Sequence, residues 1–150
     1  MTEPAEVIVL NALLGRLITS AAGVVPGTSD VVSPAIQVAS PLVNFIPVMS
    51  TTYLDAHPLL RAEPDAPGLA FNSSVFRRGI FQIDAVIPDN QGEAVGLRLA
   101  AAVRDRFARG TRLIAGTYLV TLDKEPTIAA AVKDAPWVRF PVSIPFELIN

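Results

Sequence analysis

The stretch SVFRRGIFQIDAVIP, from Ser74 to Pro88, decides how the fold of this chain is interpreted. Two arginines and a glycine lead into an apolar run, so the stretch could be a catalytic loop, a phosphate-binding turn or the start of a strand. Within it, Gln82 and Asp84 alternate with apolar residues from Phe81 to Ile87, which is the period of a half-buried strand. The glycine is followed by this strand pattern and not by a helix N-terminus, so the usual phosphate site is absent. We therefore predict a strand from Phe76 to Ile87.

Two helices are predicted, one on each side of this strand along the chain. The first runs from Pro4 to about Ser20 and the second from about Glu93 to Arg109, where apolar residues recur at helical spacing. Asn90 and Glu93 are spaced for a capping box at the start of the second helix. Gly96 lies in its apolar stripe and would let this helix approach a sheet closely.

The first helix is apolar nearly all round. Its predicted apolar face consists of Val7, Leu10, Leu14, Leu17 and Ile18, while Ile8, Val9 and Leu13 lie off that face. Such a helix implies burial on two sides. In a chain of 150 residues, the second side is most simply covered by a neighbouring subunit.

The remaining elements define the predicted fold class. Extended segments are predicted at 41–48, 52–60, 113–122 and 138–146, and residues 127–132 are ambiguous between a short strand and a helical turn. Pro141 and Pro145 remove donors from one side of the last strand, which should lie at a sheet edge or have a broken ladder there. The prediction is a single α+β domain over residues 1–150, with a mainly antiparallel (mixed) sheet of about five strands. Two α-helices pack on this sheet, in the order α-β-β-β-α-β-β.

The composition is apolar for a small soluble monomer. Hydrophobic residues make up 51% of the chain and the mean hydropathy is +0.44, so some apolar surface should be buried against a partner or a membrane. A membrane span is not expected, because prolines interrupt the uncharged stretch between Asp30 and Asp55. The acidic N-terminus disfavours a signal peptide. The chain has no cysteine, which excludes disulfides, thiolate metal sites and a cysteine nucleophile.

The first candidate for chemistry is His57, the only histidine of the chain. A histidine base needs a carboxylate, and Asp55 lies two residues away, on the same face if both are in a strand. The more ordinary interpretation is a polar strand-end residue, since no nucleophile motif or nucleotide-binding motif accompanies it. Asp123, Glu125 and Asp134 cluster near one turn, where solvated acids are commoner than a metal site. We therefore predict no catalytic residue, no metal and no cofactor.

Seven arginines form a basic zone in a chain whose net charge is −2. They are Arg77, Arg78, Arg98, Arg104, Arg106, Arg109 and Arg112. One interpretation is a solvated surface, another is contact with the acids of a neighbouring subunit, and a third is contact with the backbone of DNA. Our site hypothesis is a surface that faces a subunit or DNA.

The stretch RRGIFQIDAVIPDNQGEAVGLRLAAAVRDRFARGTRL resembles the signature of the tail terminator, or tail-completion, proteins of tailed phages and prophages. The matching residues are Arg78, Gly79, Phe81, Gln82, Ile83, Pro88, Gly92, Ala100, Phe107, Gly110 and Thr111. The segments NFIPVMSTTYL (Asn44–Leu54) and WVRFPVSIPFELI (Trp137–Ile149) are similar to an upstream segment and to the closing strand of that family. The resemblance covers roughly residues 5 to 148, and the loop from Arg61 to Ser74 has no counterpart in the signature.

The resemblance implies a structural virion protein and not an enzyme. Members of the family form a homo-hexameric ring on the finished tail tube, end its polymerisation, and present a surface to the head-closure or connector protein. Genomic DNA passes non-specifically through the lumen. The implied partners are therefore the tail tube protein, the connector protein and DNA, with no membrane. The implied location is the tail or neck of a virion assembled in the host cytoplasm.

Two alternatives stay open from the sequence. A head-closure or neck connector ring could use the same kind of fold, and only its position in the particle separates it from a terminator. A small α+β enzyme or ligand-binding domain would need a pocket near His57 or Arg78.

Overall fold

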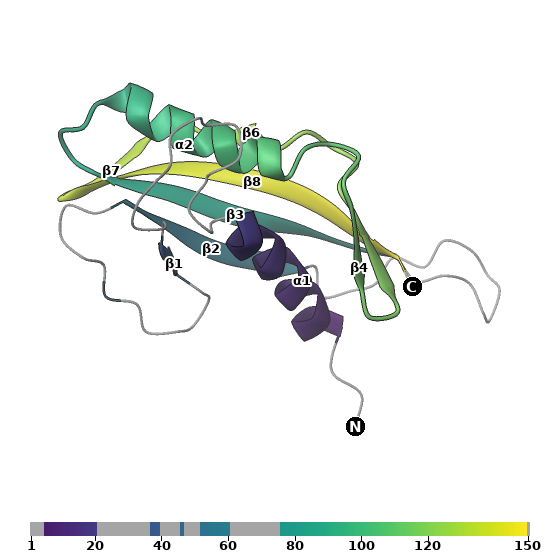
Figure 1. Ribbon diagram of the computed structural model, residues 1–150. Helices are drawn as coiled ribbons and strands as arrows, with labels where there is room; N and C mark the ends of the chain where they lie inside the picture. The colour runs from purple at the N-terminus through teal and green to yellow at the C-terminus, as the bar shows by residue number, and fades with distance from the viewer. Residues whose placement is uncertain (1–4, 21–36, 40–45, 47–51, 61–75, 150) are drawn as a thin grey trace.

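The computed structural model describes residues 5–20, 37–39, 46, 52–60 and 76–149, and it shows a curled sheet with two helices (Figure 1). The elements are α1 (Ala5–Ser20), β1 (Gln37–Ala39), β2 (Tyr53–Leu60), β3 (Phe76–Pro88), α2 (Glu93–Arg106), β4 (Arg112–Ala115), β5 (Tyr118–Thr121), β6 (Thr127–Ile128), β7 (Val132–Asp134) and β8 (Trp137–Ile149). Neighbouring strands run in the order β1-β2-β3-β8-β5-β4, while β6 and β7 pair with β8. Neither helix is long and apolar enough to cross a membrane.

The predicted fold class is confirmed at the level of its layers. Two helices pack on a mainly antiparallel sheet, and one parallel pair, β1 with β2, makes the sheet mixed. The described sheet has eight strands instead of about five, and five strands follow α2 instead of two. Three of the eight described strands, β1, β6 and β7, have only two or three residues each. Such strands are too short for a hydrophobic period to show in the sequence. The predicted strand at 41–48 lies outside the described residues, apart from Ile46.

The single strand predicted at 113–122 is instead a hairpin of β4 and β5. Ala115 pairs with Tyr118 across a turn made of Gly116 and Thr117, and Gly116 has a φ of +61°. Glycine adopts this conformation at no steric cost, which is why it is favoured in two-residue hairpin turns. The Gly-Thr pair inside an alternating run was the sequence signal for the turn.

The last strand, β8, lies inside the sheet and not at its edge. It pairs with β3 along its whole length, but on its other side the ladder is in three pieces, at residues 137–139, 142–143 and 147–149. Pro141 and Pro145 fall in the two gaps. The carbonyl of Pro141 accepts a hydrogen bond from Ala129 on the broken side, so the missing donor of Pro141 faces that side too. The predicted break in the ladder is confirmed.

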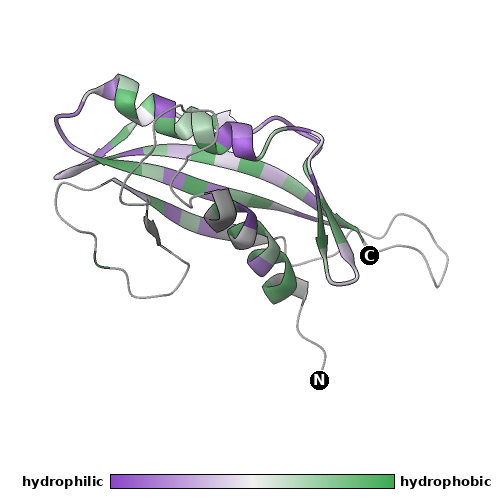
Figure 2. Cartoon of the chain, in the orientation of Figure 1, coloured by the Kyte–Doolittle hydropathy of each residue, from purple (hydrophilic) through white to green (hydrophobic). Residues whose placement is uncertain are grey.

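One face of the sheet is the core of the molecule. Phe81 and Ile83 on β3, and Phe140 and Val142 on β8, are fully buried or nearly so. Both helices contribute side chains to this same hydrophobic cluster. Figure 2 shows β3 and β8 as alternating hydrophobic and hydrophilic bands, which is how one face becomes apolar and the other polar. The strand predicted from the opening stretch is confirmed.

α2 lies close to the sheet because of Gly96. This glycine is buried, and a Cβ atom in its place would collide with the ring of Phe140. At the other end of the helix, Phe107 is fully buried and packs edge-to-face on Phe81, with 5.7 Å between ring centroids. The predicted close approach of helix and sheet is confirmed.

The two ends of α2 differ from those predicted. The helix begins at Glu93 with Gly92 as its N-cap and no side-chain capping bond, so the predicted capping box with Asn90 is wrong. It ends at Arg106, earlier than predicted, because Phe107 leaves the helical conformation where it enters the core.

The buried face of α1 was only partly predicted. Leu17 is buried as predicted, but so are Val9 and Leu13, which were placed off the face, whereas Val7 is 37% exposed and Leu10 is only half-buried. A helix that is apolar all round does not reveal its buried side by periodicity, because the packing of β4, β5 and α2 selects it. Contact of the remaining apolar side with a neighbouring subunit stays a prediction.

Candidate functional site

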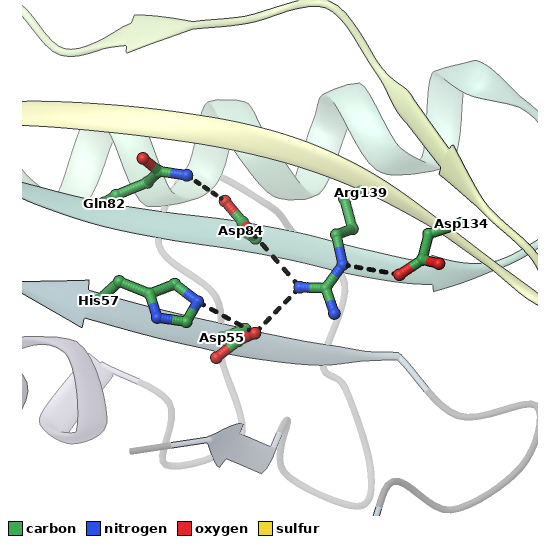
Figure 3. A network of polar contacts seen from close by, with 6 residues as sticks. All are labelled: Asp55, His57, Gln82, Asp84, Asp134 and Arg139. Carbon is green, nitrogen blue, oxygen red and sulfur yellow. Dashed lines mark hydrogen bonds and ion pairs between the residues drawn. The ribbon is translucent and has the colours of Figure 1, made fainter. Parts of the chain in front are cut away.

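The sheet face turned away from the helices carries a polar network (Figure 3). Its residues are Asp55 and His57 on β2, Gln82 and Asp84 on β3, Asp134 on β7 and Arg139 on β8. Alternation along the strands places them here, because the residues between them point into the core. The network therefore joins four strands from three distant parts of the sequence.

Arg139 lies at the centre of the network. Its Nη1 atom is 2.9 Å from Asp55 Oδ2 and 3.4 Å from Asp84 Oδ2, and its Nε atom is 3.4 Å from Asp134 Oδ2. Asp55 and Asp84 are directly opposite each other in the β2–β3 register. Two like charges in that position destabilise a sheet, and the guanidinium between them offsets this repulsion.

Asp84 is the most deeply placed of these charges, with 7% of its surface exposed. Gln82 donates a hydrogen bond of 3.0 Å from Nε2 to its Oδ1 atom, and Arg139 reaches its other oxygen. A buried carboxylate requires such partners, because desolvation without them is costly. Burial acts to lower the pKa of Arg139, but its hydrogen bonds to Asp55 and Asp134 and nearby charges outweigh this and raise the pKa, so the guanidinium stays charged.

A small apolar cluster borders the network on the same face. Tyr53 and Trp137 contact each other edge-to-face, with ring centroids 5.5 Å apart, and Ala39 and Val86 complete the cluster. Burial raises the pKa of the Tyr53 hydroxyl, so Tyr53 is neutral at physiological pH. The cluster shields part of the network from water.

The predicted alignment of His57 with Asp55 is present. His57 Nε2 is 3.1 Å from Asp55 Oδ2, and about half of the imidazole is exposed. Among the described strands paired with β2 and β3, the nearest serine or threonine hydroxyl in register with His57 is that of Ser143, which pairs with Gln82, the cross-strand neighbour of His57. Two strand spacings, about 10 Å, separate it from His57, which is too far for a nucleophile and its base. These described strands therefore do not bring a serine or threonine nucleophile to the His57–Asp55 pair.

The same face also has the donor atoms of a possible cation site. Ligand atoms of Asp55, His57 and Asp84 all lie within 4.8 Å of one another. However, the guanidinium of Arg139 already lies between the two carboxylates. A divalent ion would have to displace this positive charge, so the arrangement fits an internal ion pair better than a metal site.

The structure distributes the seven predicted arginines over three places. Arg104 and Arg106 end α2, and Arg109 and Arg112 flank the turn that follows it. Arg98 is exposed farther back on α2. Arg78 lies on β3, where its Nε atom is 3.1 Å from a carboxylate oxygen of Glu147. Arg77 is also in β3, and its side chain lies outside the described residues. Whether any of them faces a subunit or DNA stays a prediction.

Arg106 has a role inside the fold. Its Nε–H group donates to the carbonyl of Arg16 on α1 at 3.1 Å, and Arg16 donates from Nε to the carbonyl of Arg106 at 2.9 Å. The last four carbonyls of a helix lack partners within the helix, so Arg16 caps the C-terminus of α2, and the return bond from Arg106 ties this end of α2 to α1. Burial, and then the charge of Arg106, lower the pKa of Arg16.

The turn after α2 explains why its motif residues are of these types. Gly110 has a φ of +90°, and its amide donates to the carbonyl of Leu122. The hydroxyl of Thr111 donates to the carbonyl of Ala108 at 2.7 Å. With Phe107 buried in the core, this turn fixes the direction of the β4–β5 hairpin.

Sequence reasoning missed most of the network. Asp84 and Gln82 were recognised only as polar positions of a strand, and Arg139 was not singled out. The available signal was one charged residue inside the alternating run of each long strand, Asp84 in β3 and Arg139 in β8, with opposite signs.

One comparison with known proteins gives a family, and two others give a shared fold. A model of the family "Phage tail terminator protein" matches residues 9–146. One solved chain, 19% identical, superposes with a TM-score of 0.75 over 97% of this chain and 96% of that chain. A chain from the virion of a native gene transfer agent particle is 16% identical, with a TM-score of 0.58 over 99% of this chain and all of that chain. At such identities the superpositions establish the fold alone. No curated protein sequence matches significantly.

Proposed function

This chain belongs to the phage tail terminator family, and from that membership we propose that it caps the head-proximal end of a tail tube as a hexameric ring. The ring ends tube polymerisation and offers the surface to which the head connector attaches. The observation that carries the proposal is the family match, which extends from α1 to near the end of β8. The gene transfer agent chain of the same fold, which is part of a virion, supports a place in the particle.

The surface of the molecule suits a protein that meets several neighbours. Large apolar side chains are exposed at separate positions, among them Val7 on α1, Leu97 on α2 and Ile114 on β4. A ring built from identical subunits uses different patches on the two sides of each subunit. The partners that we propose are further copies of the chain, the tail tube protein and the head-closure or connector protein, with DNA passing through the lumen.

A structural role also fits the chemistry of the sheet. The carboxylates of the network are engaged by Arg139, and the strands described beside His57 bring no serine or threonine hydroxyl within reach of it. We therefore propose that the protein is not an enzyme and needs no cofactor.

Deletion of the gene from its phage or prophage, followed by electron microscopy of the lysate, tests this function. We expect tail tubes longer than normal and free of heads, with normal particles restored when the wild-type chain is supplied in trans. Tails of normal length joined to heads would contradict the proposal. Tails of normal length beside heads that leak DNA would place the protein in head closure instead.

A further inference from the structure

A pocket opens at the end of the molecule where α2 begins. Its volume is about 410 Å³, far above the roughly 30 Å³ of one water molecule, so it can admit a side chain. Ile87, Val138 and Phe140 supply apolar walls, and Asp89 and Glu93 supply carboxylates. We call it the α2 N-terminal pocket.

The carboxylates make this pocket unsuitable for an anion but suitable for a basic group. Glu93 is exposed at the first turn of α2. Asp89 Oδ2 is 3.5 Å from Lys133 Nζ, in an exposed ion pair of the kind that contributes little to stability. A cation brought by a partner can therefore compete for Asp89 and pair with Glu93. The matching ligand is an aliphatic side chain next to a basic one.

The opposite end of the molecule presents such a pair (Figure 1). Ile114 on β4 is 84% exposed, the highest value among the large apolar side chains of the described strands and helices. Arg112 is also exposed and lies two residues away on the same face of β4, about 7 Å along the strand. β4 ends the described row of paired strands, so Ile114 projects from an edge of the sheet.

We propose that Ile114 of one copy enters the α2 N-terminal pocket of the next copy, where Arg112 pairs with Asp89 and Glu93. The charges are complementary, because arginines gather near the end of α2 while carboxylates line the pocket at its start. The contact joins different patches at opposite ends of the molecule, so it is heterologous and can repeat around a closed ring. The inference rests on the proposed ring, and it names the residues that hold neighbouring subunits together.

The chain has no native cysteine, so a disulfide between two copies can form only through cysteines that are introduced. Ala131 lines the pocket and is exposed, so the double variant Ile114→Cys/Ala131→Cys places one thiol on each side of the contact. Particles assembled with this variant are purified, oxidised and analysed on a non-reducing gel. We expect a ladder of cross-linked species that ends at six copies. Each single variant serves as a control and should give no species larger than a dimer.

The outcomes separate the contact from the function. If the double-cysteine chain is present in particles but gives no ladder, the contact is wrong and the ring can stand. If Ile114→Cys cross-links instead to a cysteine introduced in the tail tube protein, Ile114 faces the tube and the contact is again wrong. If the wild-type chain is absent from particles, the proposed function fails and the contact fails with it.

A charge exchange provides a second, independent measurement. Arg112→Glu should reduce incorporation into particles at least tenfold, and adding Glu93→Arg should restore most of it. Ile114→Ser should weaken association about 10- to 100-fold per contact, the expected loss from one aliphatic anchor. Ile80→Ser is the matched control, because Ile80 is another exposed isoleucine on a strand, and it lies on β3 outside both β4 and the lining of the pocket. Equal effects of the two serine variants, with no rescue by the second charge change, would overturn the contact.

Discussion

The two faces of the sheet are stabilised in different ways. Beneath the helices, aliphatic and aromatic side chains such as Phe81 and Phe140 are buried by shape and hydrophobic contact. On the other face, Asp84 is buried because Arg139 and Gln82 satisfy it. Both faces thus complete their contacts within one chain. The difference teaches that a group of acids, a histidine and an arginine can be an ion-pair network that stabilises the sheet, and we propose that partners meet the exposed ends of the molecule instead.

The largest expected effect comes from Gly96→Ala on the core face. The added methyl group has no room against the ring of Phe140, which is itself 1% exposed. We expect a loss of about 3 kcal/mol in the free energy of unfolding, or roughly 6–12 °C in Tm. Gly15→Ala in α1 is the matched control, since a Cβ there meets nothing within 4 Å and alanine favours a helix. Thermal denaturation should show opposite signs for the two variants, and equal signs would mean that α2 does not lie as described.

Arg139→Met should break the polar face without disturbing the core face. The variant keeps an unbranched, flexible side chain but leaves Asp55 and Asp84 opposite each other without a cation. We expect a loss of about 2 kcal/mol, below the roughly 3–5 kcal/mol for a fully buried pair, because the Arg139 side chain is 26% exposed. Chemical denaturation measures this loss.

Two further variants make that result specific. Adding Asp84→Asn to Arg139→Met should recover much of the stability, because one of the two facing charges is removed. Arg98→Met, at an exposed arginine of α2, should change stability by less than about 0.5 kcal/mol. If Arg139→Met were as mild as Arg98→Met, the network would not be a structural clamp.

The smallest effect is expected from His57→Ala. The imidazole is about half exposed, and such ion pairs contribute about 0–1 kcal/mol. A phage that carries this variant should keep its titre and its tail length, as measured by plaque assay and electron microscopy. A collapse of the titre with an intact ring would show that the polar face performs chemistry, and the distinction between the two faces would fail.

The sequence predicts the core face better than the polar face. Alternation in β3 and β8 and the glycine at position 96 reveal which residues meet under α2, since hydrophobic period and backbone contact are local properties. The pairing of Asp84 with Arg139 depends on which strands become neighbours, and β3 and β8 are separated by about fifty residues. No local pattern carries that information. The buried side of α1 was predicted correctly for Leu17 but wrongly for Val9 and Leu13, because tertiary contacts select it.

The ends of the molecule were only partly predictable. The basic character of the region after α2 is visible in the sequence, and so is the acidic turn before it. The exposure of Ile114 was not predicted from the sequence, because 113–122 was predicted as one strand and not as a hairpin at the edge of the sheet. The pocket was equally hidden, since its walls come from β3, α2 and β8 together.

A cryo-EM map of the assembled particle is the most direct measurement of how this chain functions. We expect six copies in one ring between the tail tube and the neck, with Ile114 of each copy in the α2 N-terminal pocket of the next. In the same map, the polar face should hold Arg139 between Asp55 and Asp84 without added density for a ligand. A ring absent from that position, or one whose subunits meet through other surfaces, would contradict the function or the contact, respectively.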